Sequence, residues 1–219
     1  MASVHVYGDE GGDLVFKAPT RGVSRYFMIG TVTLGDDCSL GDRLLALRRR
    51  LGWEGLALEE LHAANDRQLV RNRVYELLSE GEFRFDVTIL DKRKARDDVR
   101  ADPLYFYKLA WYLHLKYVAP RIVRPHDELM VVASSLLVAK KKRAVARAVR
   151  EVVAQVSPTA SFRTGFAATM SDPCLQIADY MVWAIQRKYE SGDDRSYKLI
   201  GSKIATEFQP FLVGEKVYY

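Results

Sequence analysis

The sequence contains little cysteine, and its two cysteines lie far apart. Cys38 and Cys174 are the only ones in 219 residues, which argues against a disulfide scaffold and against a zinc site built on cysteine. The chain also lacks any run of about 18 apolar residues, which a membrane-spanning helix needs. Its first residues, M-A-S-V-H-V, show no basic segment followed by an apolar one, so we expect no export signal. These absences predict a soluble, cytoplasmic protein without a membrane partner.

Positive charge is only slightly in excess of negative charge. Lys and Arg number 33 against 28 Asp and Glu, for a formal net charge of +5 and a sequence pI near 9.1. Such an excess is mild for a nucleic-acid-binding protein, in which the location of the charges matters more than their sum. With 48% hydrophobic residues, the chain can bury a sizeable core, and its length favours one large domain.

Hydrophobic spacing predicts strands and helices along the whole chain. Apolar alternation favours five strands, and spacings of three and four residues favour five helices, the second of which Asp66 would cap. The order predicts an α/β fold with a mixed five-stranded sheet and helices on both faces. The strands are expected at residues 3–8, 25–34, 83–91, 129–134 and 161–168, and the helices at 40–51, 66–79, 103–118, 139–155 and 173–190.

Two adjacent acids close the first expected strand, in V-H-V-Y-G-D-E-G-G-D (residues 4–13). Successive side chains of a strand point to opposite faces, so Asp9 and Glu10 should diverge, and at most one of them needs to face a shared site. Gly11 and Gly12 allow the backbone to turn sharply after them. A solvated turn, in which the aspartate bonds its own backbone, explains the same residues, so this motif alone leaves both interpretations open.

A buried acid is expected on the last long helix, in S-D-P-C-L-Q-I-A-D-Y (residues 171–180). Asp172 before Pro173 has the form of an N-cap, which is a structural role. Asp179 lies seven residues later on the same helical face and has mostly apolar neighbours. Because a carboxylate is costly to bury unless a cation or hydrogen-bond donors hold it, Asp179 is the stronger functional candidate.

A divalent cation would account for both Asp9 and Asp179. Carboxylates from a strand end and from a packed helix supply the hard oxygen ligands that Mg²⁺ prefers, and such a centre can activate water for phosphodiester hydrolysis. His62, in L-H-A-A-N-D, could bind the metal, move a proton or orient a phosphate. A lone histidine, however, is more often a hydrogen-bonded structural residue.

Basic residues gather at the start of one expected helix and at the end of another. The run A-K-K-K-R (residues 139–143) places four cations where they oppose the helix dipole. A polyanion partner would stabilise them, and a solvated helix face is the alternative. Positive charge after the helix that carries Asp179 suggests a groove that tracks a phosphate backbone. The candidate nucleic-acid-binding residues are Lys140, Lys141, Lys142, Arg143, Arg187 and Lys188.

Together these motifs resemble the family called domain of unknown function 3800, which is regarded as ribonuclease-H-like with predicted nuclease activity. Its hallmarks are an opening D-E-S-G-like motif and a late L-Q-x-A-D motif. Here they read Y-G-D-E-G-G-D (7–13) and C-L-Q-I-A-D-Y (174–180), with an H-A element at residues 62–63. The resemblance covers nearly the whole chain and implies a single ribonuclease-H-like domain over residues 1–219, with helical insertions.

The resemblance also implies roles for the acids. Asp9 and Asp179 would be the principal Mg²⁺ or Mn²⁺ ligands and Asp172 a further one, while Glu10 and His62 would be supporting catalytic residues.

The sequence departs from the family pattern at two places. Gly11 stands where a serine is usual, which removes a hydroxyl but keeps the turn. Ribonuclease-H-like nucleases generally bring a further acid from the fourth strand, and here that strand reads V-V-A-S-S (131–135).

The leading hypothesis is therefore a Mg²⁺- or Mn²⁺-dependent nuclease that acts on DNA or RNA. The alternative is a non-catalytic subunit that binds nucleic acid or protein and retains a degenerate nuclease fold, which the missing fourth-strand acid favours. A cation with a purely structural role is a third hypothesis. A homo-oligomer or a complex with a partner protein is compatible with all three.

Overall fold

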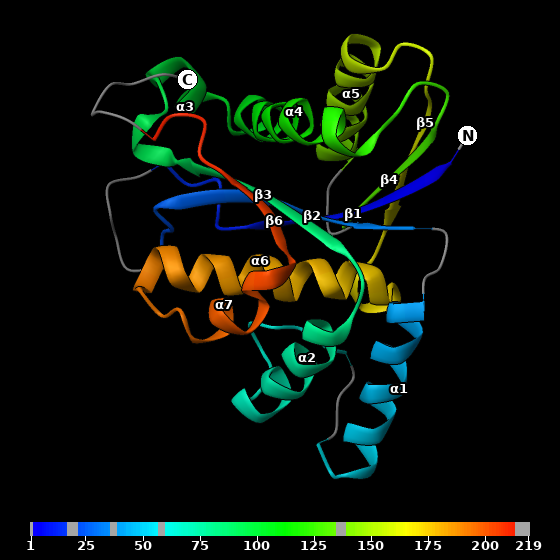
Figure 1. Ribbon diagram of the computed structural model, residues 1–219. Helices are drawn as coiled ribbons and strands as arrows, with labels where there is room; N and C mark the ends of the chain where they lie inside the picture. The colour runs from blue at the N-terminus through cyan, green and yellow to red at the C-terminus, as the bar shows by residue number, and fades with distance from the viewer. Residues whose placement is uncertain (1, 17–21, 36–38, 57–59, 135–138, 213–219) are drawn as a thin grey trace.

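The protein forms a mixed sheet of six strands with helices on both faces (Figure 1). The computed structural model describes residues 2–16, 22–35, 39–56, 60–134 and 139–212, so that Cys38 and Ser135 lie outside the described residues. The strands are β1 (Ser3–Gly11), β2 (Tyr26–Leu34), β3 (Arg84–Asp91), β4 (Glu128–Ser134), β5 (Ser161–Ala167) and β6 (Ile204–Phe208).

Seven α-helices occur in the described part of the chain. They are α1 (Ser39–Trp53), α2 (Gln68–Glu80), α3 (Asp97–Ala101), α4 (Pro103–Ile122), α5 (Ala139–Val156), α6 (Pro173–Ser191) and α7 (Arg195–Ile200). Short 3-10 turns lie at Lys92–Lys94, Thr169–Ser171 and Gly201–Lys203. No helix among the described residues is long and apolar enough to span a membrane.

The strand order is β5-β4-β1-β2-β3-β6. β1, β2 and β3 pair antiparallel in succession, whereas β4 pairs parallel with β1, β5 with β4, and β6 with β3. β1 is thus an inner strand, in which Gly8 pairs with Ala133 of β4 and Asp9 with Gly30 of β2. The acids that follow Gly8 therefore lie at the end of a strand in the middle of the sheet.

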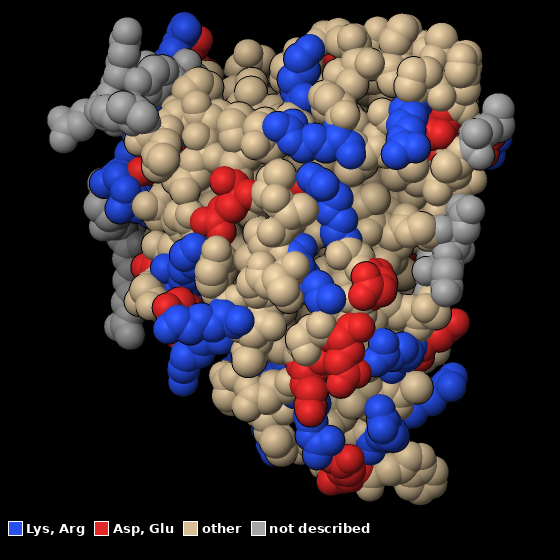
Figure 2. Space-filling view, viewed as in Figure 1, with Lys and Arg blue, Asp and Glu red and all other residues tan. Residues whose placement is uncertain are grey.

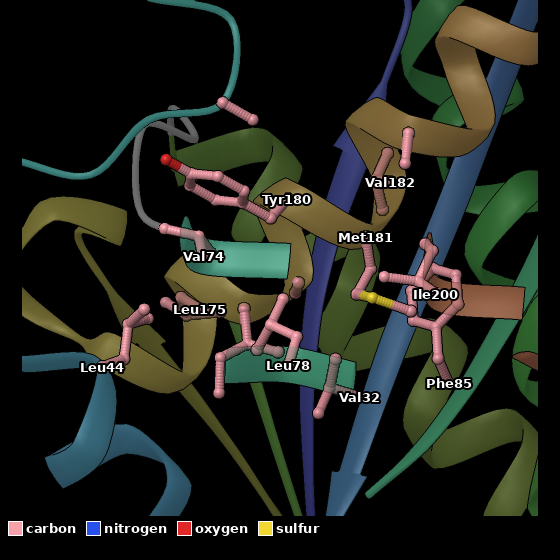
Figure 3. Close-up of a cluster of buried hydrophobic side chains, with 14 of the residues drawn as sticks. Val32, Leu44, Val74, Leu78, Phe85, Leu175, Tyr180, Met181, Val182 and Ile200 are labelled. Carbon is pink, nitrogen blue, oxygen red and sulfur yellow. The ribbon is translucent and has the colours of Figure 1, made fainter. Parts of the chain in front are cut away.

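Each face of the sheet buries its own hydrophobic cluster. Helices α4 and α5 cover one face, where Trp111 and Phe106 are fully buried. Helix α6 crosses the other face, and α1, α2 and α7 pack around it (Figure 1). Figure 3 shows the second cluster, in which Met181 and Val182 of α6 lie near Phe85 of β3.

Two glycines allow α6 to approach the sheet closely. A Cβ atom at Gly30 would lie 2.3 Å from a methyl group of Val182, and one at Gly11 would lie 2.7 Å from the other methyl group. Both distances are far below van der Waals contact, so only glycine leaves room for Val182 at these two points. Because Asp179 precedes Val182 by three residues, it lies on the same side of the helix, and this packing carries it toward the end of β1.

The prediction of an α/β fold with helices on both faces is confirmed, and all five expected strands are present. The strand number was wrong, however, because β6 adds a sixth strand beside β3. The prediction that Asp66 caps the second helix was also wrong. That helix begins at Gln68 after Arg67, which makes no side-chain capping bond, and Asp66 has other partners, described below.

Candidate functional site

A pocket of about 290 Å³ lies where the end of β1 meets α6 and the segment before α2. Five ionisable groups from different parts of the chain line it, and the short turn at Thr169–Ser171 contributes hydroxyl and apolar groups. The ionisable residues besides Glu10 are Asp9, Glu60, His62 and Asp179. The pocket therefore brings together four of the five acidic and histidine residues that the sequence singled out.

The Asp179 carboxylate is fixed by the segment around His62. Its Oδ2 atom accepts a hydrogen bond of 2.8 Å from the Ala63 backbone N–H and lies 3.2 Å from His62 Nδ1. The imidazole N–H does not point straight at the oxygen, so the latter contact is better described as an ion pair than as an aligned hydrogen bond. Asp179 is 8% exposed, and these two partners provide the compensation that a buried carboxylate requires.

Asp9 has a strongly perturbed carboxyl group. Burial raises the pKa of Asp9 to about 8, and the negative charges of Asp179 and Glu10 act in the same direction. Near neutral pH the carboxyl therefore holds its proton as long as no cation lies close to it. Buried acids that repel one another in a pocket are a recurrent feature of functional sites.

The pKa of His62 is also raised, which for a base favours the charged form. The Asp179 carboxylate is the main cause that raises the pKa of His62 to about 9, while partial burial opposes the shift and Glu60 and Asp9 add to it. The imidazole is thus protonated at neutral pH. With 39% of its side chain exposed, it presents a positive charge to the pocket.

Asp66 holds the backbone that carries His62. Its Oδ2 atom accepts a hydrogen bond of 2.9 Å from the His62 backbone N–H and another from the Tyr180 hydroxyl. Figure 3 shows the Tyr180 hydroxyl at the edge of the hydrophobic cluster, directed away from it. Arg71 donates to the Ala63 and Asp66 carbonyls. These contacts tie the segment to α6, so its position relative to Asp179 is defined by several bonds.

Glu10 points to the opposite face of the sheet from Asp9, as the alternation of a strand requires. Its Oε2 accepts a hydrogen bond of 2.7 Å from the Tyr107 hydroxyl of α4, and its Oε1 lies 3.1 Å from Lys141 Nζ of α5. Glu10 still lines the pocket. It therefore connects the pocket to the helices on the other face rather than duplicating the role of Asp9.

Asp172 does not line the pocket. It is the N-cap of α6, and its Oδ1 accepts hydrogen bonds of 2.9 and 3.3 Å from the N–H groups of Cys174 and Leu175. The structural interpretation of the Asp-Pro pair is therefore confirmed. The Oδ1 atom is directed to the backbone, and Asp172 is not among the residues that line the pocket with Asp9 and Asp179.

The fourth strand brings a hydroxyl group, not an acid, to the pocket. Ser134 ends β4 beside the end of β1 and lines the pocket, and its Oγ lies 2.9 Å from the Thr169 hydroxyl. The described end of β4 therefore offers a hydroxyl group at the place where the family pattern leads us to expect an acid.

The candidate nucleic-acid-binding residues lie in four different surroundings. Lys140 and Arg143 line a separate groove between α4 and α5, and Lys141 contacts Glu10. Lys142 lies over the Phe166 ring, 5.5 Å from its centroid. The remaining two residues, Arg187 and Lys188, lie about 12 Å further along α6 than Asp179 and pair with Asp193 and Glu207, respectively.

Glu60 is a pocket residue that the sequence interpretation missed. It lies in an irregular segment two residues before His62, so no helical or strand periodicity drew attention to it. Its negative charge contributes to the raised pKa of His62. The only available signal was its spacing, because residues i and i+2 of an extended segment lie on the same side.

The donors of the pocket suit a hard divalent cation in kind. Asp9 and Asp179 offer carboxylate oxygens, and the raised pKa of Asp9 reflects a crowding of negative charge that a cation would relieve. Asp179 Oδ1 has no hydrogen-bond partner among the described residues, unlike Oδ2. No ready-made group of three or more His, Cys, Asp or Glu ligands occurs in the described ranges, so water or substrate oxygens would complete the coordination.

Comparison with family models and with curated proteins finds no match for this chain. The functional conclusion therefore depends on the geometry and chemistry of the pocket.

Proposed function

We propose that the protein is a Mg²⁺- or Mn²⁺-dependent nuclease with a ribonuclease-H-like fold, related to the domain of unknown function 3800 family. One observation carries the proposal. A carboxylate at the end of an inner strand and a carboxylate on a packed helix, Asp9 and Asp179, line one pocket, where burial and then the charge of Asp179 raise the pKa of Asp9. The fold is supported by the strand order, in which the antiparallel strands β3, β2 and β1 are followed by the parallel strands β4 and β5.

Each pocket residue has its own role in this function. Asp9 and Asp179 hold the ion, which in such centres activates water and stabilises the leaving oxygen of a phosphodiester. The Ala63 N–H and the His62 ring orient Asp179 through its Oδ2 atom. The protonated, partly exposed imidazole attracts a substrate phosphate and is a proton donor for the leaving oxygen. The expectation that Asp172 is a ligand is not part of the proposal, because its oxygen caps α6.

The test is hydrolysis of labelled single- and double-stranded DNA and RNA with Mg²⁺ or Mn²⁺. We expect cleavage by the native chain and its loss in Asp9→Asn and Asp179→Asn, each of which keeps the shape of the side chain. Asp97→Asn is the matched control, because this acid is fully exposed on α3. Unchanged cleavage by the two pocket variants would refute the assignment.

A non-catalytic nucleic-acid- or protein-binding subunit is the second candidate. It is favoured by the fourth strand, which brings Ser134 to the pocket where an acid would complete a nuclease site. This function predicts binding of oligonucleotides without turnover in either metal, and no loss of binding in Asp179→Asn. Calorimetric titration of Mg²⁺ and Mn²⁺ into the native chain and into Asp179→Asn separates the two candidates, because only the nuclease requires a bound ion.

A further inference from the structure

A groove larger than the acidic pocket lies outside the candidate site, between α4 and α5. It measures about 710 Å³, against about 290 Å³ for the acidic pocket. The first turns of α4 form one wall and the first three turns of α5 form the other. On the face seen in Figure 2, basic and acidic side chains are interspersed, whereas the charged side chains of the α5 wall of this groove are all basic.

These cations form a row along one side of α5. Lys140, Arg143, Arg147 and Arg150 follow one another at steps of three, four and three residues, which places them on one helical face. We call them the basic row. The row extends over about 15 Å at 1.5 Å per residue, which is long enough to contact three or four consecutive phosphates.

No acidic side chain neutralises the basic row within the described parts of the chain. None of its four members makes an ion pair there, and two acids at the groove have other partners: Asp102, which lines it, and Glu151, which pairs with the lining residue Lys108. Glu151 pairs with Lys108 at 2.7 Å, and Asp102 accepts the N–H groups at the start of α4. Because four uncompensated cations repel one another, and Lys140 also opposes the dipole at the start of α5, an anionic ligand with several charges would stabilise this wall.

An aromatic ring lies on the facing wall. Tyr105 is 50% exposed, although the neighbouring Phe106 and Tyr107 are fully buried, and it lines the groove with Leu104. An exposed ring opposite a row of cations is the combination that binds single-stranded nucleic acid, because bases stack on the ring while phosphates follow the charges. A duplex, whose bases already stack on one another, would leave Tyr105 unused.

The groove is joined to the candidate site through Glu10. Tyr107, beside Lys108 on α4, donates a hydrogen bond to Glu10 Oε2, and Lys141, beside Lys140 on α5, lies 3.1 Å from Glu10 Oε1. Both contacts come from the two helices that form the groove. The helices that form the groove thus also contact an acid that lines the pocket.

We propose that the groove between α4 and α5 binds single-stranded nucleic acid, with phosphates along the basic row and a base stacked on Tyr105. The inference deepens the proposed function, on which the choice of a nucleic acid over other polyanions rests. The proposed binding is specific to the groove and is not a general attraction of nucleic acid to basic residues. Four of the other basic residues lie outside the groove, namely Lys141, Lys142, Arg187 and Lys188.

The experiment measures binding of fluorescent oligonucleotides of about 12 nucleotides by anisotropy in EDTA, so that no cleavage occurs. The probes are single-stranded DNA, single-stranded RNA and a DNA duplex, each at several NaCl concentrations. Arg143→Ala/Arg147→Ala removes two charges from the row, and Arg49→Ala/Arg50→Ala removes two from α1, on the opposite side of the sheet (Figure 1). Thermal melting of each variant verifies folding.

We expect the groove variant to bind single strands about tenfold or more weakly than the α1 variant, with the slope of log Kd against log salt reduced by about 1.4 for two lost phosphate contacts. Arg143→Lys/Arg147→Lys should keep most of the binding. Equal affinities and slopes in the two alanine variants would overturn the inference. The DNA and RNA probes show which strand is preferred.

Tyr105 provides an independent test of single-strand binding. Tyr105→Ala should weaken binding of single strands about fivefold or more, since loss of one stacked base is worth at least about a factor of five, whereas Tyr105→Phe should stay within about twofold. Equal duplex and single-strand binding with no effect of Tyr105→Ala would overturn it. Loss of binding in the groove variants without nuclease activity in the native chain would refute the proposed function alone, and cleavage with unaltered binding would refute the groove alone.

Discussion

Replacement of the buried His114 by glutamine should remove a pH-dependent part of the protein's stability. His114 is fully buried between α4 and the sheet, where Nε2 lies 2.8 Å from the Thr31 hydroxyl and Nδ1 lies 3.0 Å from the Thr88 hydroxyl. Burial disfavours the charged imidazole and lowers the pKa of His114 to about 4. Glutamine can bond to hydroxyl groups but does not titrate.

The sign and size follow from proton linkage. Between pH 6.5 and about 4 the unfolded chain binds a proton at His114 and the folded chain does not, so the free energy of unfolding falls as the pH falls. A shift from 6.5 to about 4 corresponds to about 3 kcal/mol at 1.36 kcal/mol per pH unit. The full stabilisation is present above pH 6.5 and is lost by about pH 4.

Urea unfolding at a series of pH values measures this effect. Other groups titrate in the same range, so the quantity to follow is the difference in unfolding free energy between the native chain and His114→Gln, in which their contributions cancel. This difference should decrease by about 3 kcal/mol from pH 7 to pH 4. His126→Asn, at an exposed histidine with a φ of 67°, is the control and should track the native chain. A difference that does not vary with pH would refute the reasoning.

Three further predictions concern packing, capping and the pocket. Gly30→Ala should destabilise the protein by about 1–3 kcal/mol in urea unfolding, because its Cβ would meet Val182. Gly35→Ala is the control and should not destabilise it, because the space around Gly35 is open. Equal unfolding midpoints of the two variants would contradict the close approach of α6. Asp172→Ala should cost about 1 kcal/mol through loss of the α6 N-cap, and a larger loss of ion binding than of stability would show it to be a ligand. Asp9→Asn should raise the thermal midpoint of the ion-free protein more at pH 8 than at pH 4. The reason is that the pKa of Asp9 is raised to about 8, so the stability due to its bound proton is lost as the pH rises. An effect of Asp9→Asn that does not vary with pH would contradict the burial of its charge.

Much of the fold could be predicted from local patterns, because most strands and helices bury one face and show it as periodicity. β6 could not, since its five residues, I-A-T-E-F at the edge of the sheet, carry almost no alternation. The N-cap of α6 was predicted because Asp172 and Pro173 are adjacent and capping is local. The partners of Asp66 were missed because its carboxylate bonds to Tyr180, 114 residues away.

The part of the candidate site that shows in local sequence patterns was also predicted. Asp9 and Asp179 stood out as carboxylates in apolar surroundings, and the divergence of Asp9 and Glu10 followed from the alternation of a strand. Glu60 was missed because irregular segments obtain their position from tertiary contacts. The role of Lys141 as a partner of Glu10 also depends on the pairing of β1 with β4 and on the path of α5, which one sequence does not reveal.

The contact of Val182 with Gly11 and Gly30 has a consequence for the metal centre that we propose. The separation of the two carboxylates is set by hydrocarbon packing between a helix and a sheet, so it exists before any ion arrives. A centre assembled this way does not have to fold around its ion, as a zinc finger does. The ion should therefore leave the circular dichroism spectrum unchanged and raise the melting temperature only by mass action. Metal exchange, rather than metal-dependent folding, is the behaviour that this architecture favours.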